Sequence, residues 1–189
     1  MSRLNASNST EVNEGQNIEV FLQKIDEDGG QIELETDQSG EIKSLFISSK
    51  IMRDAFSSTN PPLIQVDTSF NVDKARYKIA AFCYLNLTTN KTEIAAIAYI
   101  ADETASSLDF VFGNFSDLCN NSKDKMFIVD KDFTQIGSIK KHFPMSIILL
   151  CQFHTLKYMR TLMATALATV EQKTIYMINL KGYFILLLR

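Results

Sequence analysis

Apolar side chains recur with two different periods near the start of the chain, and each period predicts a different kind of element. Residues 18–25 have apolar positions at helical spacing, so we expect a short helix that Gly29 and Gly30 end. Residues 31–36 and 41–48 instead alternate between apolar and polar side chains. The Gly-containing turn between these two runs predicts a β-hairpin.

A second short helix is expected after the hairpin, over the sequence KIMRDAF. Ser48 or Ser49 is suited to cap its first turn, and the Asn-Pro-Pro sequence at residues 60–62 would end it. Residues 18–60 are therefore expected to form a small α+β appendage ahead of the main domain. Residues 1–17 are polar and predict a disordered lead-in.

From Leu63 onward the expected order of elements is β-β-β-α-β-α-β-α, which favours an α/β fold with a mixed sheet and helices on its faces. Ligands of such sheets gather at the carboxyl ends of the strands. The expected strands are 63–67, 76–87, 92–102, 126–130 and 146–151, and the expected helices are 103–118, 132–143 and a long one from residue 154.

Two of the expected strands end in an aspartate, Asp67 and Asp130. If these strands are parallel neighbours, both carboxylates emerge at one edge of the sheet, where a divalent cation would relieve their repulsion. Hard oxygen ligands suit Mg²⁺ or Mn²⁺, and two such ions can assist phosphoryl transfer. The alternative is structural, because an aspartate at a strand end is often a turn or capping residue.

Cys151 ends the last expected strand and His154 comes three residues later. The two could be half of a zinc site, whose structural form needs four ligands. The remaining cysteines, Cys83 and Cys119, are expected within a strand and at a helix end. A buried cysteine and a capping histidine are the structural alternative. We expect Mg²⁺ or Mn²⁺ as the candidate cofactor and no zinc within this chain.

Composition and charge narrow the function classes. Hydrophobic residues make up 46% of the 189-residue chain, which excludes a wholly disordered protein. Residues 1–60 hold eleven acidic and five basic residues, and residues 61–189 hold eleven acidic and fourteen basic residues. The sequence therefore has no strongly basic stripe that would indicate nucleic-acid binding. Three unpaired cysteines and the absence of an apolar leader favour a reducing compartment, and no segment is long enough to predict a membrane span.

A group of lysines surrounds the second aspartate in the sequence. They are interleaved with acidic residues, so they either approach phosphate or form a solvated face. The group consists of Lys123, Lys125, Lys131, Lys140 and Lys141.

Three segments, QVDTSFNVDKARYKIAAFCYL, AYIADETASSLDF and FIVDKDFTQIGSIKKHFPMSIILLCQFHTLKYMR, resemble the RNase H-like domain of Mutator-like (MULE-type) DDE transposases, and in particular the transposase-derived SWIM-type zinc-finger proteins. The resemblance implies an RNase H-like mixed sheet. It places Asp67 and Asp130 at the family's first two metal-binding acids, and Cys151 and His154 at its C-x-x-H motif. It also matches Glu103 to the acid of the family's acid-Thr pair, whose role we interpret as structural. Asp132 is better suited to cap the following helix than to bind a metal.

The chain departs from the family pattern in two respects. The third catalytic acid, usually a glutamate on a later helix, has only Glu171 as a candidate, and the Cys-x-Cys…Cys-x-His pattern of the SWIM finger is absent. We therefore expect residues 61–170 to form a truncated RNase H-like domain. The apolar tail at residues 171–189 has no assignment.

Three functions follow from these observations. The first is a transposase-derived module, catalytically inactive or incomplete, that associates with DNA or with proteins in the nucleus. The second is an active two-metal nuclease or DNA transposase that uses Asp67 and Asp130. The third is a protein-interaction domain with no nucleic-acid role, for which the cytosol is the alternative location.

Overall fold

A computed structural model describes residues 18–69, 76–120 and 124–166 of the chain. The expected lead-in at 1–17, the apolar tail at 171–189 and Glu171 lie outside the described residues. After a helix at residues 18–27, the elements are β1 (Gln31–Thr36), β2 (Ile42–Ser48), α2 (Lys50–Thr59), β3 (Leu63–Ser69), β4 (Lys78–Asn86), β5 (Lys91–Ile100), α3 (Ala105–Leu118), β6 (Met126–Val129), α4 (Phe133–His142), β7 (Ile147–Leu150) and α5 (Gln152–Ala166).

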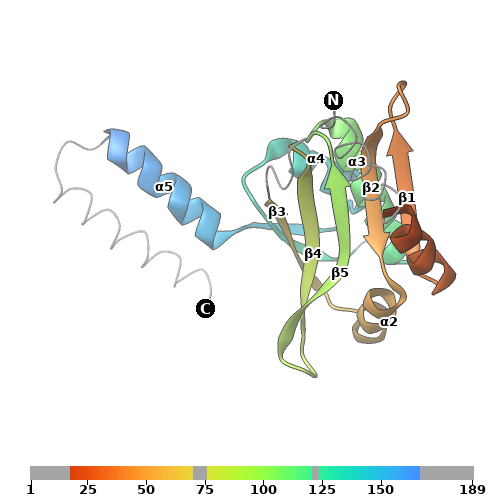
Figure 1. Ribbon diagram of the computed structural model, residues 1–189. Coiled ribbons are helices and arrows are strands. Elements are labelled where there is room, and N and C mark those ends of the chain that lie inside the picture. Colours follow the sequence, from red (N-terminus) through yellow and green to blue (C-terminus); the bar gives the residue numbers. More distant parts are fainter. Residues whose placement is uncertain (1–17, 70–75, 121–123, 167–189) are drawn as a thin grey trace, which may run out of the picture.

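The seven strands form one mixed sheet in the order β1-β2-β5-β4-β3-β6-β7 (Figure 1). The strands from β1 to β3 pair antiparallel, whereas β3 with β6 and β6 with β7 pair parallel. From β3 onward the order of elements is β-β-β-α-β-α-β-α, so the predicted α/β fold with a mixed sheet is confirmed.

The N-terminal hairpin belongs to this same sheet. Residues 44–47 of β2 pair antiparallel with residues 97–100 of β5, so β1 and β2 extend the sheet at its antiparallel end. The helix before the hairpin ends at the predicted glycines, where Gly29 has a φ of +83° that a residue with a Cβ rarely adopts. The region that we expected as an appendage therefore continues the domain's own sheet.

Local signals fix the helix ends as the sequence predicts. The side chain of Ser49 accepts a hydrogen bond from the Met52 amide at the start of α2, and Asn60 ends this helix in the left-handed conformation. The side chain of Asp132 accepts hydrogen bonds from the Thr134 and Gln135 amides and so caps α4.

The core lies between one face of the sheet and the helices α3 and α4. Its centre is a cluster of buried aromatic rings from strands and helices, in which Phe115 of α3 stacks on Phe82 of β4 with ring centroids 4.2 Å apart. Phe56 of α2 packs against Phe115 as well, at 5.7 Å. This face of the sheet therefore holds the helical layer in place.

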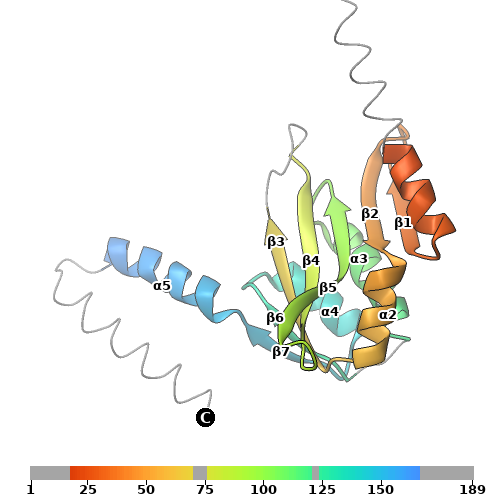
Figure 2. The ribbon, with the colours of Figure 1, turned by 60° about the horizontal axis from the view of Figure 1, so that its bottom comes forward.

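The opposite face of the sheet carries apolar side chains that remain accessible to solvent. Ile147 and Leu149 of β7 are 57% and 45% exposed, and Leu85 of β4 is exposed as well. In both views, α5 extends away from the sheet (Figures 1 and 2). None of the described helices combines the length and the apolar character that crossing a bilayer requires.

Candidate metal-binding site

The strands β3, β6 and β7 run parallel, so their carboxyl ends point to the same side of the sheet. In the β3–β6 ladder Gln65 lies opposite Ile128, and in the β6–β7 ladder Val129 lies opposite Leu150. Continuing the two registers by one or two residues places three candidate ligands in a single row. The row consists of Asp67, Asp130 and Cys151. The expectation that Asp67 ends its strand is wrong, because β3 continues to Ser69 in its pairing with β4.

Strand alternation decides which face this row occupies. Phe127 and Val129 of β6 are buried in the core, so Asp130, one residue further, belongs to the opposite face of the sheet. Val66 of β3 is buried in the same way, and Asp67 is exposed. The candidate ligands therefore lie on the face that α3 and α4 leave uncovered.

The environment of Asp130 is consistent with a ligand-binding carboxylate. Partial burial raises the pKa of Asp130 above its ordinary value, while the charge of His154 and its hydrogen bond act in the opposite direction. The negative charges of Asp67 and Asp132 raise this pKa further. The charge of Asp67 thus reaches Asp130, as expected of two carboxylates that lie opposite each other on adjacent parallel strands.

His154 reaches Asp130 because α5 begins directly after β7. The Cys151 amide donates a hydrogen bond of 2.7 Å to the Val129 carbonyl and so continues the β6–β7 ladder, while its own carbonyl accepts from the Thr155 amide and starts the helix. His154 therefore falls in the first turn, where its Nδ1 makes direct contact with Oδ1 of Asp130. Both side chains are about one-third exposed.

A second contact joins the same parts of the chain. Nζ of Lys131, the residue after Asp130, lies 4.6 Å from the centroid of the Tyr158 ring on α5. His154 and Tyr158 are four residues apart and so share one face of the helix. The first two turns of α5 therefore face the end of β6.

Three different ligand atoms meet at this point. Asp130, Cys151 and His154 each offer one atom, and these atoms all lie within 4.8 Å of one another. Among the described residues, this is the one group of three or more histidine, cysteine, aspartate or glutamate side chains whose ligand atoms gather so closely. The structure thus joins the predicted Cys151–His154 pair to the second predicted aspartate.

Other predicted residues have roles away from this group. Glu103 forms an ion pair of 2.5 Å with Lys78, and Thr104 after it caps α3. The prediction that Lys125 either approaches phosphate or belongs to a solvated face is wrong. Its ammonium is buried and donates hydrogen bonds to Oδ1 of Asn60, at 2.7 Å, and to the Pro61 carbonyl, at 3.0 Å.

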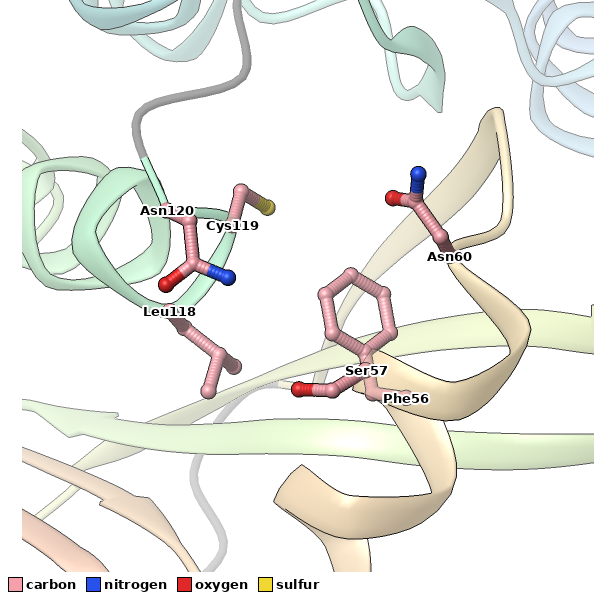
Figure 3. A pocket seen from close by; sticks show the side chains of 6 residues that line it. All are labelled: Phe56, Ser57, Asn60, Leu118, Cys119 and Asn120. Atoms are coloured by element: carbon pink, nitrogen blue, oxygen red, sulfur yellow. The ribbon is translucent and has the colours of Figure 1, made fainter.

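The two remaining cysteines do not join the ligand group. Cys83 lies on β4, where burial and the charge of Asp67 raise the pKa of its thiol. Cys119 ends α3 and lines a pocket of about 300 Å³ between the ends of α2 and α3, together with Phe56, Asn60 and three other residues (Figure 3). This pocket is formed by a different part of the fold from the strand-end row.

The contact between Asp130 and His154 was not predicted from the sequence. One signal does point to it: the cysteine of the C-x-x-H motif ends the expected strand 146–151, and the structure pairs this strand with the one that Asp130 follows. An α-helix completes almost one turn in three residues. The residue three positions after Cys151, His154, therefore lies close to the end of the neighbouring strand.

A seven-stranded mixed sheet with neighbouring aspartates on two adjacent parallel strands is typical of an α/β domain of the RNase H-like class. A family model described as the RNaseH-like domain of zinc finger SWIM domain-containing protein 1/3 matches residues 21–149, well over half of the chain. The chain belongs to this family. A search of curated proteins found no match.

Proposed function

We propose that this protein is a transposase-derived module that associates with DNA in the nucleus and does not cut it. One observation carries the proposal. Asp67 and Asp130 lie side by side on adjacent parallel strands, as two metal-binding acids of a nuclease would, but the one close group of candidate ligands among the described residues adds no third carboxylate to them.

The chemistry of strand cleavage explains why this difference matters. Asp67 and Asp130 would hold Mg²⁺ or Mn²⁺ through hard oxygen atoms, and these ions would supply charge stabilisation for phosphoryl transfer. A two-metal site needs further carboxylate oxygen to hold the second ion. Within the described residues, the neighbours of Asp130 provide a thiol and an imidazole instead.

Exposed basic side chains on the segments that follow Asp130 in the chain support contact with a phosphate backbone. Lys131 follows Asp130 directly, and Lys157 and Arg160 lie on α5; all three are exposed. On α4, Lys140 is exposed as well. Exposed lysines and arginines of this kind bind phosphates without regard to base sequence.

DNA binding would be measured by fluorescence anisotropy of a labelled duplex over a series of salt concentrations. We expect affinity to fall as salt rises, and a Lys157→Gln/Arg160→Gln double variant to reduce the slope of log affinity against log salt by about 0.9 for each phosphate that is no longer neutralised. Lys50→Gln, an exposed lysine on α2, is the matched control and should keep the full slope. Binding that is absent or independent of salt would favour the protein-interaction domain with no nucleic-acid role.

Cleavage would be measured as nicking of supercoiled plasmid in Mn²⁺. We expect no nicking above the background of a buffer control. Nicking that is present in the wild type and lost in Asp130→Asn would establish the alternative, an active nuclease or transposase, and would overturn our proposal. A fluorescent fusion in cells distinguishes nuclear from cytosolic protein.

A further inference from the structure

The ligand atoms of Asp130, Cys151 and His154 converge at the point where α5 leaves the sheet, and the proposed function uses this convergence only as a reason why a second catalytic ion is not held. We propose that these three side chains form a Zn²⁺ site, and that the bound ion fixes the first turn of α5 to the ends of β6 and β7. This inference is independent of whether the domain binds DNA.

The distances are close to those that one ion requires. Ligand atoms around a tetrahedral zinc ion lie roughly 3.3–3.7 Å apart, given the usual zinc–ligand bond lengths. The three atoms here lie within 4.8 Å of one another, so adjustments of about 1 Å suffice to place them around zinc. The cysteine and the aspartate are held at the ends of adjacent parallel strands, and the histidine is in the first helical turn after them.

The ligand types select the metal. A thiolate is a soft ligand and an imidazole is intermediate, and together they favour Zn²⁺ over Mg²⁺. Three protein ligands of this mixture leave a fourth tetrahedral position to water. All three residues are half-buried, which limits competition from solvent while leaving a route for the ion to enter.

The proposed ion also has a structural effect. In its absence, the first two turns of α5 are joined to the end of β6 by the contact of His154 with Asp130 and that of Lys131 with Tyr158. Both are partly exposed polar contacts, which typically contribute about 1 kcal/mol or less. A metal that coordinates both strand ends and the helix would hold α5 far more firmly.

Binding is tested by titrating the full chain with Co²⁺, which occupies tetrahedral zinc sites and absorbs light when it does so. We expect one equivalent to produce visible d–d bands and a near-ultraviolet thiolate-to-cobalt charge-transfer band, and Zn²⁺ to abolish both by displacement. Cys151→Ser should lose the charge-transfer band. Asp130→Asn and His154→Gln should weaken binding by more than about tenfold.

Matched controls distinguish this site from the other candidate ligands. Cys83→Ser removes another half-buried cysteine and should leave the charge-transfer band unchanged. Asp67→Asn tests the remaining member of the strand-end row and should change the affinity for Co²⁺ by less than about threefold, because water and not Asp67 fills the fourth position. A millimolar excess of Mg²⁺ should not displace the cobalt.

A second measurement does not depend on the variants folding. Mass spectrometry of the wild-type chain treated with iodoacetamide should show that Zn²⁺ protects Cys151 from alkylation, and hydrogen exchange should show slower exchange of the first α5 amides. The proposal is overturned if the wild-type chain gives no thiolate band, if Mg²⁺ displaces the cobalt, or if Zn²⁺ leaves the alkylation of Cys151 unchanged.

Discussion

The two faces of the sheet differ in what they contribute to the molecule. One face is covered by α3 and α4, and its aromatic side chains, such as Phe82 and Phe127, are fully buried. The other face exposes Ile147 and Leu149 and carries the strand-end row at its edge. Stability is therefore concentrated on one side of the sheet and candidate chemistry on the other.

The same strands supply both faces, so the difference arises from alternation within each strand. In β6, Phe127 and Val129 point into the core, while Ile128 and the following Asp130 belong to the other face. A four-residue strand thus serves packing and ligand placement at once. Substitutions on the two faces should consequently separate these effects.

The largest effect is expected for Phe115→Ala. Its ring stacks on Phe82 and also contacts Phe127 and Phe143, so truncation leaves a cavity at the centre of the core. We expect the free energy of unfolding to fall by about 3–5 kcal/mol in urea denaturation. Phe153→Ala removes an aromatic ring that is 69% exposed and should change it by less than about 0.5 kcal/mol. An equal loss of unfolding free energy in the two variants would mean that the buried and the exposed ring do not differ in packing.

Lys125→Met tests whether the covered side also depends on a buried polar contact. The lysine ammonium satisfies the Pro61 carbonyl and the Asn60 side chain, and methionine fills a similar volume without a donor. We expect a loss of about 2 kcal/mol in the same denaturation experiment. Lys140→Met, at an exposed position of α4, should stay within about 0.5 kcal/mol of the wild type.

Asp109→Asn tests how α3 is joined to α4. Hydrogen bonds from Lys141 and Ser138 hold the pKa of the Asp109 carboxyl below its ordinary 3.8. The ionised carboxylate therefore stabilises the fold above that value, and this contribution is lost as the pH falls through the lowered pKa. We expect a loss of about 1 kcal/mol at pH 7, discounted for partial exposure, that shrinks below about pH 4. A pH-independent difference, measured by urea denaturation at several pH values, would contradict this origin.

The smallest effect is expected for Leu149→Ala on the uncovered face. Its side chain is already 45% exposed, so truncation should lower the free energy of unfolding by only about 0.5–1 kcal/mol. Leu108→Ala, a buried leucine of α3, is the matched comparison and should lose about 2–5 kcal/mol. A similar loss at both positions would show that something covers this face in solution.

The sequence predicted those parts of the fold that depend on local signals. The capping roles of Ser49 and Asp132, the hairpin turns and the apolar strands all follow from residues close together in the chain, and the structure confirms them. The argument about Asp67 and Asp130 depended on the condition that their strands are parallel neighbours, and β3 and β6 do pair in parallel.

The missed features depend on contacts between distant segments. No local pattern indicates that β2 pairs with β5, because an alternating hairpin can stand alone or join a sheet. Lys125 lies in a polar stretch typical of a surface loop, and only the packing of residues 60 and 61 against it makes it a buried residue. The meeting of His154 with Asp130 depends on the direction in which α5 leaves β7, which sequence spacing alone does not define.

The row at the strand ends depends on strand register alone. Because successive side chains point to opposite sides of a strand, a slip of β6 by a single residue would turn Asp130 toward the aromatic core and expose Val129 in its place. Insertions in the loop that precedes β6 would be tolerated only if the pairing of Gln65 with Ile128 were preserved. Evolution of this domain could therefore lengthen the loop before β6 as long as this pairing is kept, whereas one deletion inside the four-residue strand would remove the site while leaving the composition almost unchanged.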